Sequence, residues 1–336
     1  MGIKIGLTLP NRGVLLGATT PAELVDLAEI ADKSGAFESV WVGDSLLAKP
    51  RLESITLLSA IASRTSQVKL GPACMASFPL RDPILLADQW ASLDQLAGGR
   101  TILVACNGNV VQAGVNVELD YYGVTPSTRV GRVTEGVQIL RKLWGEDDVS
   151  FQGKHFSFEN VSIAPKPVHG ADTPIWLAVH PPADRPDLIE KAHNRIVKYA
   201  DGWQTSKWQH DDLAWRIDDL KSKAAEAGKD VFTHLYHNVN LTDDLAAATD
   251  ESKKFLDAYY TMDYPEPFVQ GWTSQGTAEQ VIERIKSYEA IGFDGITLRI
   301  TSWNQREQLA RLIEEVLPHF PDSAGSAVAE EATVAD

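Results

Sequence analysis

The amino-acid sequence predicts an α/β protein, a (β/α)8 barrel with an insertion after its fourth strand. Eight short apolar stretches recur along the chain, and they alternate with at least eight segments of helical periodicity. The stretches are apolar almost throughout, as parallel strands are when helices cover both faces of their sheet. No linker divides the chain into halves, which favours a closed barrel over an open doubly wound sheet.

The first half of the chain predicts four pairs of a strand and a helix. The first helix is the best marked, because Thr20 can cap it, Pro21 suits its first position and Gly35 can end it. The other assignments rest on apolar runs that stop at small or polar residues and on the amphipathic segments between them. The expected elements are strand 3–9, helix 21–34, strand 39–42, helix 52–64, strand 68–74, helix 83–96 and strand 100–108.

The second half begins with the insertion and then resumes the alternation. A loop after Gly108 leads to helix 127–144, and the aromatic pattern of residues 149–163 predicts a hairpin-like excursion. The remaining expected elements are strand 174–179, helix 185–199, strand 201–205, helix 211–228, strand 231–241, helix 243–260, an irregular connection 262–272, helix 277–291, strand 296–300 and helix 305–320.

Composition limits the domain organisation and the partners. With 44% hydrophobic and 23% charged residues, the 336-residue chain can bury a large core, and we expect a single domain over residues 1–320. Residues 321–336 are acidic and contain no lysine or arginine, so we expect a flexible tail. A net charge of −15 argues against a nucleic-acid partner.

Localisation and metal content follow from what the sequence lacks. No run of about 18 apolar residues is present and the chain starts directly in a strand pattern, so we expect a cytoplasmic protein without a membrane span. The two cysteines, Cys74 and Cys106, match no zinc motif, and two thiols in a chain of this length suggest a reducing compartment. The first strand carries no histidine pair, so no metal is expected.

Several blocks of the sequence resemble the bacterial luciferase-like flavin-dependent oxidoreductases. They are VWVGDSLL, RDPILLADQWASLDQLAGGR, RVGRVTEGVQILRKLW, VSFQGKHFSFENVSIAPKPV, PIWLAV, KYADGW and GTAEQVIERIKSYEAIGFDGITLR, and the resemblance spans residues 3–318. It implies a (β/α)8 barrel that binds reduced FMN, or alternatively the deazaflavin coenzyme F420, at the carboxyl ends of its strands. The cofactor then carries the chemistry.

The resemblance and the strand ends together give the candidate site residues. The expected catalytic residues are Asp44, Ser45, Cys106 and Asn107. The expected cofactor-binding residues are Leu9, Pro10, Cys74, Met75, Ala76, Cys106, Asn107, Gly108, Val179, His180, Gln204 and Thr205. The expected substrate-binding residues are Asn11, Trp203, Trp272 and Arg299.

Two positions depart from the pattern of the family. Ser45 stands where many members have a histidine, and a serine is a poor general base, so we expect a positioning role. The turn after the fifth strand, where members hold the cofactor phosphate, contains two prolines and Asp184 instead of glycine and serine. Either His180 and Arg185 supply cationic contacts, or the phosphate site differs.

Three functions are consistent with these observations. The first is a monooxygenase that uses reduced FMN and O2 on a small organic substrate, with a separate flavin reductase supplying the reduced cofactor. The alternatives are an F420-dependent enzyme that transfers hydride without oxygen, and a flavin-binding subunit without catalysis. The resemblance also implies a homodimer.

Overall fold

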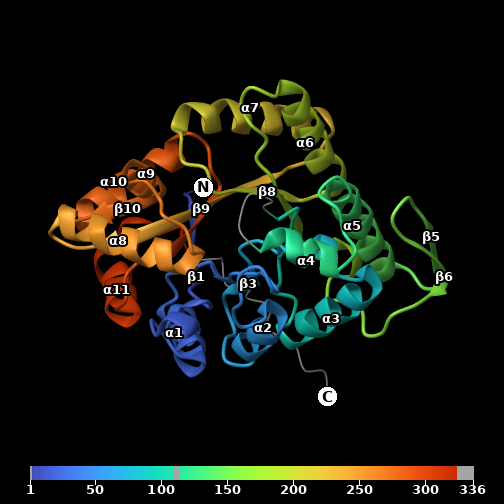
Figure 1. The fold of residues 1–336 in the computed structure, drawn as a ribbon, viewed down its shortest axis with the longest axis horizontal. Coiled ribbons are helices and arrows are strands. Elements are labelled where there is room, and N and C mark those ends of the chain that lie inside the picture. Colours follow the sequence, from blue (N-terminus) through green and yellow to red (C-terminus); the bar gives the residue numbers. More distant parts are fainter. Residues whose placement is uncertain (1, 109–113, 324–336) are drawn as a thin grey trace, which may run out of the picture.

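The protein is a closed barrel of eight parallel strands in a computed structural model that describes residues 2–108 and 114–323 (Figure 1). The strands follow one another around the barrel in the order β3 (Lys69–Pro72), β2 (Ser39–Val42), β1 (Lys4–Leu9), β11 (Gly295–Ile300), β9 (Phe232–Leu241), β8 (Gly202–Thr205), β7 (Ile175–Ala178) and β4 (Leu103–Cys106). Backbone hydrogen bonds between β3 and β4 close it: Leu70 N–H donates to Arg100 O at 2.8 Å, and Met75 N–H donates to Val104 O at 2.8 Å. The predicted (β/α)8 barrel is confirmed.

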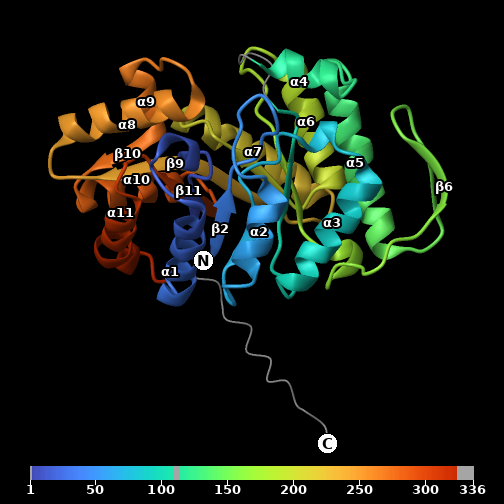
Figure 2. The same ribbon diagram turned by 60° about the horizontal axis from the view of Figure 1, so that its bottom comes forward.

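Helices connect the strands and surround the barrel (Figures 1 and 2). The first of them begins as expected, because Thr20 accepts a hydrogen bond from Glu23 N–H in a capping box, and Gly35 ends it with φ 62°. The helices that follow the strands are α1 (Pro21–Ser34), α2 (Ser54–Ala62), α3 (Pro83–Leu96), α5 (Arg129–Gly145), α6 (Pro186–Tyr199), α7 (His210–Glu226), α8 (Leu245–Tyr260), α10 (Ala278–Ala290) and α11 (Gln305–Arg311).

The predicted insertion lies between β4 and β7. It contains α4 (Val115–Tyr121), α5 and an antiparallel hairpin of β5 (Val149–Gln152) and β6 (Ser157–Val161), which projects beyond α5 in both views (Figures 1 and 2). The carboxylate of Glu135 on α5 accepts hydrogen bonds from three successive N–H groups of the hairpin turn, residues 154–156. The hairpin is thereby fixed to the barrel wall.

The connection after α8 contains two elements that the sequence did not predict. They are α9 (Glu266–Trp272) and β10 (Thr273–Gly276), and β10 pairs in parallel with β9 from Asn238 to Leu241. β8 pairs with the same edge of β9 only as far as Leu235. β10 therefore pairs with the backbone N–H and C=O groups of β9 that lie beyond the end of β8. The predicted last helix is also shorter, with a π-helical turn at Leu312–Val316 and a 3-10 turn at Leu317–His319 after α11.

Two tryptophans fill the interior of the barrel. The ring centroids of Trp41 on β2 and Trp176 on β7 lie 5.5 Å apart, and Phe232 stacks on Trp176 at 5.0 Å. Their size requires glycine on neighbouring strands, because a Cβ at Gly71 would overlap Trp41, and a Cβ at Gly202 would overlap Trp176. The interior is therefore solid at this level, and ligands have room only at the carboxyl ends of the strands.

The last described residues pack against the N-terminal part of the chain. Lys4 Nζ donates to Asp322 O at 2.6 Å, and the buried Ser323 donates through Oγ to Ala36 O at 2.8 Å. Residues 321–323 of the predicted tail thus pack on the barrel, and its remainder, 324–336, lies outside the described residues. Within the described ranges, no helix is long and apolar enough to cross a membrane.

Candidate active site

Small residues at the ends of three neighbouring strands form the accessible part of the barrel mouth. The preceding residues of these strands are almost all buried, whereas the small residues at their ends are partly exposed. Gly108 has φ 70°, and a Cβ there would lie 3.0 Å from the carbonyl oxygen of Ala76, so the two loops approach closely. We call this group the small-residue wall, and its members are Cys74, Ala76, Cys106, Gly108 and Ala178.

The two cysteine thiols interact within this wall. The contact with Cys106, together with burial, raises the pKa of the Cys74 thiol. The same contact lowers the pKa of the Cys106 thiol, which also accepts a hydrogen bond from Gly108 N–H at 3.2 Å. Both cysteines are free thiols, and the shifts favour the thiolate form at Cys106 over Cys74.

The loop after β4 takes its shape from α5. Arg129 donates from Nη1 to the carbonyl oxygens of Asn107 at 2.5 Å and Gly108 at 2.9 Å. The side chain of Asn107 is half-buried beside the small-residue wall. Arg129 is thus a buried support of the predicted site.

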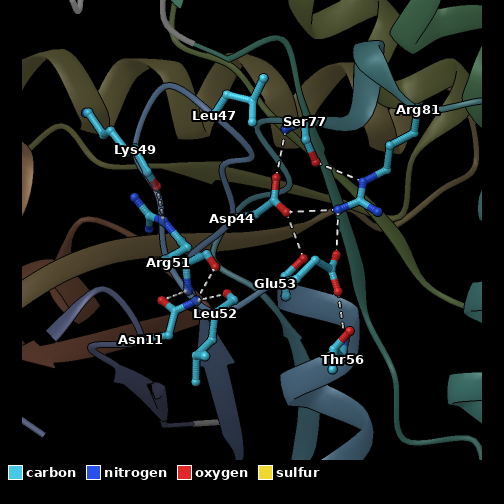
Figure 3. Close-up of polar contacts among 12 residues, drawn as sticks. Asn11, Asp44, Leu47, Lys49, Arg51, Leu52, Glu53, Thr56, Ser77 and Arg81 are labelled. Carbon is cyan, nitrogen blue, oxygen red and sulfur yellow. Dashed lines mark hydrogen bonds and ion pairs between the residues drawn. The ribbon is translucent and has the colours of Figure 1, made fainter. Parts of the chain in front are cut away.

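Asp44, a predicted catalytic residue, lies in a dense hydrogen-bond network at the end of β2 (Figure 3). Its Oδ2 accepts from Ser77 N–H at 2.7 Å, and its Oδ1 accepts from Ser54 Oγ at 2.7 Å. Arg81 lies 3.3 Å from Oδ1 and pairs with Glu53 at 2.7 Å. The carboxylate therefore joins the ends of β2 and β3 to α2, which indicates a positioning role.

Asn11 and Ser45 hold the loop that follows β2. The Asn11 amide donates to the carbonyl oxygens of Gly43 at 2.7 Å and Leu52 at 3.0 Å, and its Oδ1 accepts from Gly43 N–H at 3.0 Å (Figure 3). Ser45 Oγ accepts from Lys49 N–H at 3.1 Å. Asn11 lies at the mouth as predicted, but its amide is already engaged by the protein.

The turn after β7 offers no free cation. His180 contacts Asp212 at 2.9 Å and Thr205 Oγ1 at 3.0 Å, and burial and Arg216 lower its pKa to about 4 against the opposing effect of Asp212. Arg185 pairs with Asp187 at the surface. Of the two alternatives left by the sequence, the geometry favours a phosphate site elsewhere.

Successive side chains of a strand point to opposite faces, and this alternation places the side chains of Trp203 and Met75 away from the barrel mouth. Gln204 points into the barrel and contacts His234 at 2.9 Å, so its neighbour Trp203 points outward, where its ring faces Phe293 at 6.2 Å. Met75 is likewise fully buried in the core between barrel and helices, and only its backbone borders the site. Among the other predicted residues, Leu9, Pro10 and Thr205 are buried at strand ends and Val179 is half-buried there.

Arg299 and Trp272, both predicted to bind substrate, lie together on the opposite side of the mouth. The buried Arg299 donates to Asn238 Oδ1 at 3.1 and 2.8 Å and to Tyr260 OH at 2.9 Å. Its guanidinium lies 4.6 Å from the ring centre of Tyr259 and 5.7 Å from that of Trp272. Burial opposes the charge, but the neighbouring tyrosines raise the pKa of Arg299 above its ordinary value.

Sequence reasoning missed three basic residues near Arg299. Arg12 follows β1, and Lys49 and Arg51 lie in the loop after β2; all three are buried or half-buried. Lys49 Nζ lies 4.6 Å from the ring centre of Tyr260, and Arg51 lies 5.6 Å from that of Tyr259. The available signal was their position, because all three lie in loops that follow the carboxyl ends of strands, β1 for Arg12 and β2 for Lys49 and Arg51.

Comparison with known proteins gives the family. The model of the luciferase-like monooxygenase family matches residues 3–295. The chain belongs to this family, and it is an enzyme of the flavin-dependent oxidoreductase class, as its sequence predicts.

The curated relatives include a flavin-dependent monooxygenase and an F420-dependent dehydrogenase. The oxygenase component of a flavin-dependent trigonelline monooxygenase from Acinetobacter baylyi is 22% identical over 90% of each chain. An F420-dependent glucose-6-phosphate dehydrogenase from Nakamurella multipartita is 23% identical over 89% of this chain and 93% of its own. The uncharacterized protein y4wF of Sinorhizobium fredii is 30% identical, but the match spans only 48% of this chain and 46% of that protein.

A solved structure supports the fold. The monooxygenase RslO1 from Streptomyces bottropensis superposes with a TM-score of 0.78 at 20% identity, covering 94% of this chain and 99% of the other. At this identity the likeness concerns the fold alone.

A flavin-type ring fits the mouth as the structure shows it. Small residues at the ends of β3, β4 and β7 are partly exposed, and the interior below them is filled by aromatic rings. Cys74, Ala76 and Cys106 would contact the ring, and the Asn107 side chain could hydrogen-bond its polar edge. Within residues 2–108 and 114–323, no group of three or more acidic, histidine or cysteine side chains could hold a metal ion.

Proposed function

We propose that the protein is a monooxygenase that uses reduced FMN and O2 to oxidise a small organic substrate. The observation that carries the proposal is the small-residue wall, which is accessible above a solid interior and lies across the barrel mouth from the buried cation of Arg299. The likeness to an oxygenase component supports reduced FMN as the cofactor and a separate flavin reductase as its supplier.

The protein's own residues would orient the reactants and exclude water. Bound reduced flavin would supply the electrons that activate oxygen. Asp44 and Arg81 fix the ends of β2 and β3, so the small-residue wall keeps its shape during the reaction. Aromatic rings around Arg299 exclude water from the side of the mouth that faces this wall, which protects reactive species from hydrolysis.

A cofactor titration tests the proposal. Reduced FMN and reduced F420 are each titrated anaerobically into the protein, and oxygen uptake is then recorded with a panel of small organic compounds. We expect FMN to bind more tightly and at least one compound to increase oxygen uptake. Tighter binding of F420 would establish instead the hydride-transfer alternative, for which the F420-dependent relative is the supporting observation. Binding of neither cofactor would favour the non-catalytic alternative.

Alkylation of Cys106 gives a second readout that needs no substrate. Because its pKa is lowered whereas that of Cys74 is raised, iodoacetamide should modify Cys106 first. A bound flavin that contacts this thiol should slow the modification at least tenfold, as followed by mass spectrometry of the peptides. Equal rates with and without saturating FMN would place the ring away from the small-residue wall.

The quaternary structure and the compartment belong to the proposal as well. We infer a homodimer and a cytoplasmic enzyme from the family resemblance, the reduced cysteines and the acidic composition.

A further inference from the structure

Four basic side chains gather on one side of the barrel mouth. We call them the cationic cluster: Arg12, Lys49, Arg51 and Arg299. Arg12 donates to Pro50 O at 2.8 Å and Arg51 donates to Lys49 O at 3.1 Å, which ties Arg12 to the loop after β2. Lys49 and Arg299 lie against the same ring of Tyr260, and Arg51 and Arg299 lie against the same ring of Tyr259. A Cβ at Gly43 would overlap the Arg51 guanidinium, which therefore lies directly on the end of β2.

The three arginines of this cluster are not paired with acids among the described residues. In the described part of the chain, no carboxylate forms an ion pair with Arg12, Arg51 or Arg299, although ion pairs are common elsewhere in the molecule. Burial and the neighbouring Arg51, Arg12 and Arg299 lower the pKa of Lys49 to about 7. A buried guanidinium group without a carboxylate partner is costly, so the three arginines are suited to an anion that arrives from outside.

Two buried N–H donors in the same region also lack partners. Arg12 is 9% exposed and Trp272 is 6% exposed, and neither Arg12 Nε nor Trp272 Nε1 has a hydrogen-bond partner among the residues that the structure describes. Natural proteins rarely leave such donors unsatisfied, and a ligand is a common explanation. Four rings beside the cluster, the aromatic wall, supply apolar surface for an organic body; they are Tyr236, Tyr259, Tyr260 and Trp272.

The order of the strands places the cluster opposite the small-residue wall. Around the closed barrel, β11 with Arg299 stands four strands from β4 with Cys106 on either side, and β1, which precedes Arg12, stands four strands from β7. A ligand whose acidic group contacts the cluster would therefore extend its body across the mouth toward Cys106.

We propose that the cationic cluster binds the acidic group, a carboxylate, sulfonate or phosphate, of the organic substrate. The inference rests on the proposed function, because it assigns the small-residue wall to the cofactor ring. The aromatic wall then contacts the body of the substrate, and the position of the acidic group selects which atom faces the cofactor. A cofactor phosphate has the same chemistry, so the experiment must separate the two sources.

The test measures binding to the full-length protein by isothermal titration calorimetry. The probes are three pairs that differ in charge: benzoate and benzamide, hexanoate and hexanamide, and benzenesulfonate and benzenesulfonamide. We expect at least one anion to bind tenfold or more tightly than its neutral partner. We also expect Arg51→Gln to abolish that preference, whereas the matched control Arg64→Gln, at an exposed pair with Glu29, leaves it unchanged. Thermal melts establish that both variants fold.

Three results would overturn the proposal. The first is no preference for any anion in the wild-type protein, and the second is a preference that survives both Arg51→Gln and Arg299→Lys. The third is a loss of affinity for FMN, but not for riboflavin, in Arg51→Gln, because the cluster would then hold the cofactor phosphate. None of these three results requires the enzyme to turn over. If neither FMN nor F420 bound, the proposed function would be refuted, but the preference for anions could still be measured.

Discussion

Replacing Asp44 by alanine is expected to lower the free energy of unfolding by about 3 kcal/mol. The side chain of Asp44 is 1% exposed, and its removal leaves Ser77 N–H and the Ser54 hydroxyl without their acceptor. Arg81, 13% exposed, loses one of its two carboxylate partners. Urea unfolding followed by tryptophan fluorescence measures the change.

An aspartate at the surface provides the control. Asp26 is 48% exposed and lies 3.7 Å from Arg64, so Asp26→Ala should change the unfolding free energy by less than about 0.5 kcal/mol. If Asp44→Ala and Asp26→Ala unfold at the same urea concentration, the network at the end of β2 does not support the mouth. A large decrease in the free energy of unfolding for Asp44→Ala alone would measure how much the Asp44 carboxylate contributes to holding the ends of β2 and β3.

Acid is expected to destabilise the protein strongly between pH 7 and pH 5. Burial lowers the pKa of His234 to about 3 and lowers that of His237 far below its usual range, whereas both titrate near about 6.5 when unfolded. The folded state keeps these rings neutral, so the unfolded state binds more protons as the pH falls below about 6.5. Each ring should then cost about 2 kcal/mol of stability by pH 5.

His180 acts in the same direction, because its pKa is lowered to about 4. Urea unfolding at pH 7, 6 and 5 should therefore show that the free energy of unfolding decreases as the pH falls, by at least about 4 kcal/mol between pH 7 and pH 5. His237 is suited to a test because, within residues 2–108 and 114–323, neither of its ring nitrogens has a hydrogen-bond partner. His237→Leu should reduce the loss by about 2 kcal/mol, and the control His319→Gln, at an exposed residue, should not. Identical pH dependence in all three proteins would show that His237 does not contribute.

Much of the barrel could be predicted because its strands are recognisable locally. Apolar runs that end at small polar residues marked all eight strands, and capping residues marked α1. β10 could not be found in this way, since Thr273–Gly276 is polar and contains a glycine. It is a strand because β9 is longer than β8 and leaves an open edge, which is a property of the assembled sheet.

The site was predictable in position but not in its contacts. Strand ends gave Cys74, Cys106 and Arg299, yet nothing local shows that Asp44 meets Ser77 and Arg81, 33 and 37 residues later. Adjacent residues of one strand face opposite ways, so Gln204 and Trp203 could not both reach the mouth. Which of the two side chains faces into the barrel depends on how β8 pairs with β7, and that pairing is known only from the fold.

The filled interior at Trp41 and Trp176 limits where reactants can pass. Because the two rings occupy the barrel below the strand ends, a cofactor and a substrate bound at the mouth would enter and leave at the same end of the barrel. The tryptophans that stabilise the core thus also form the floor of the site.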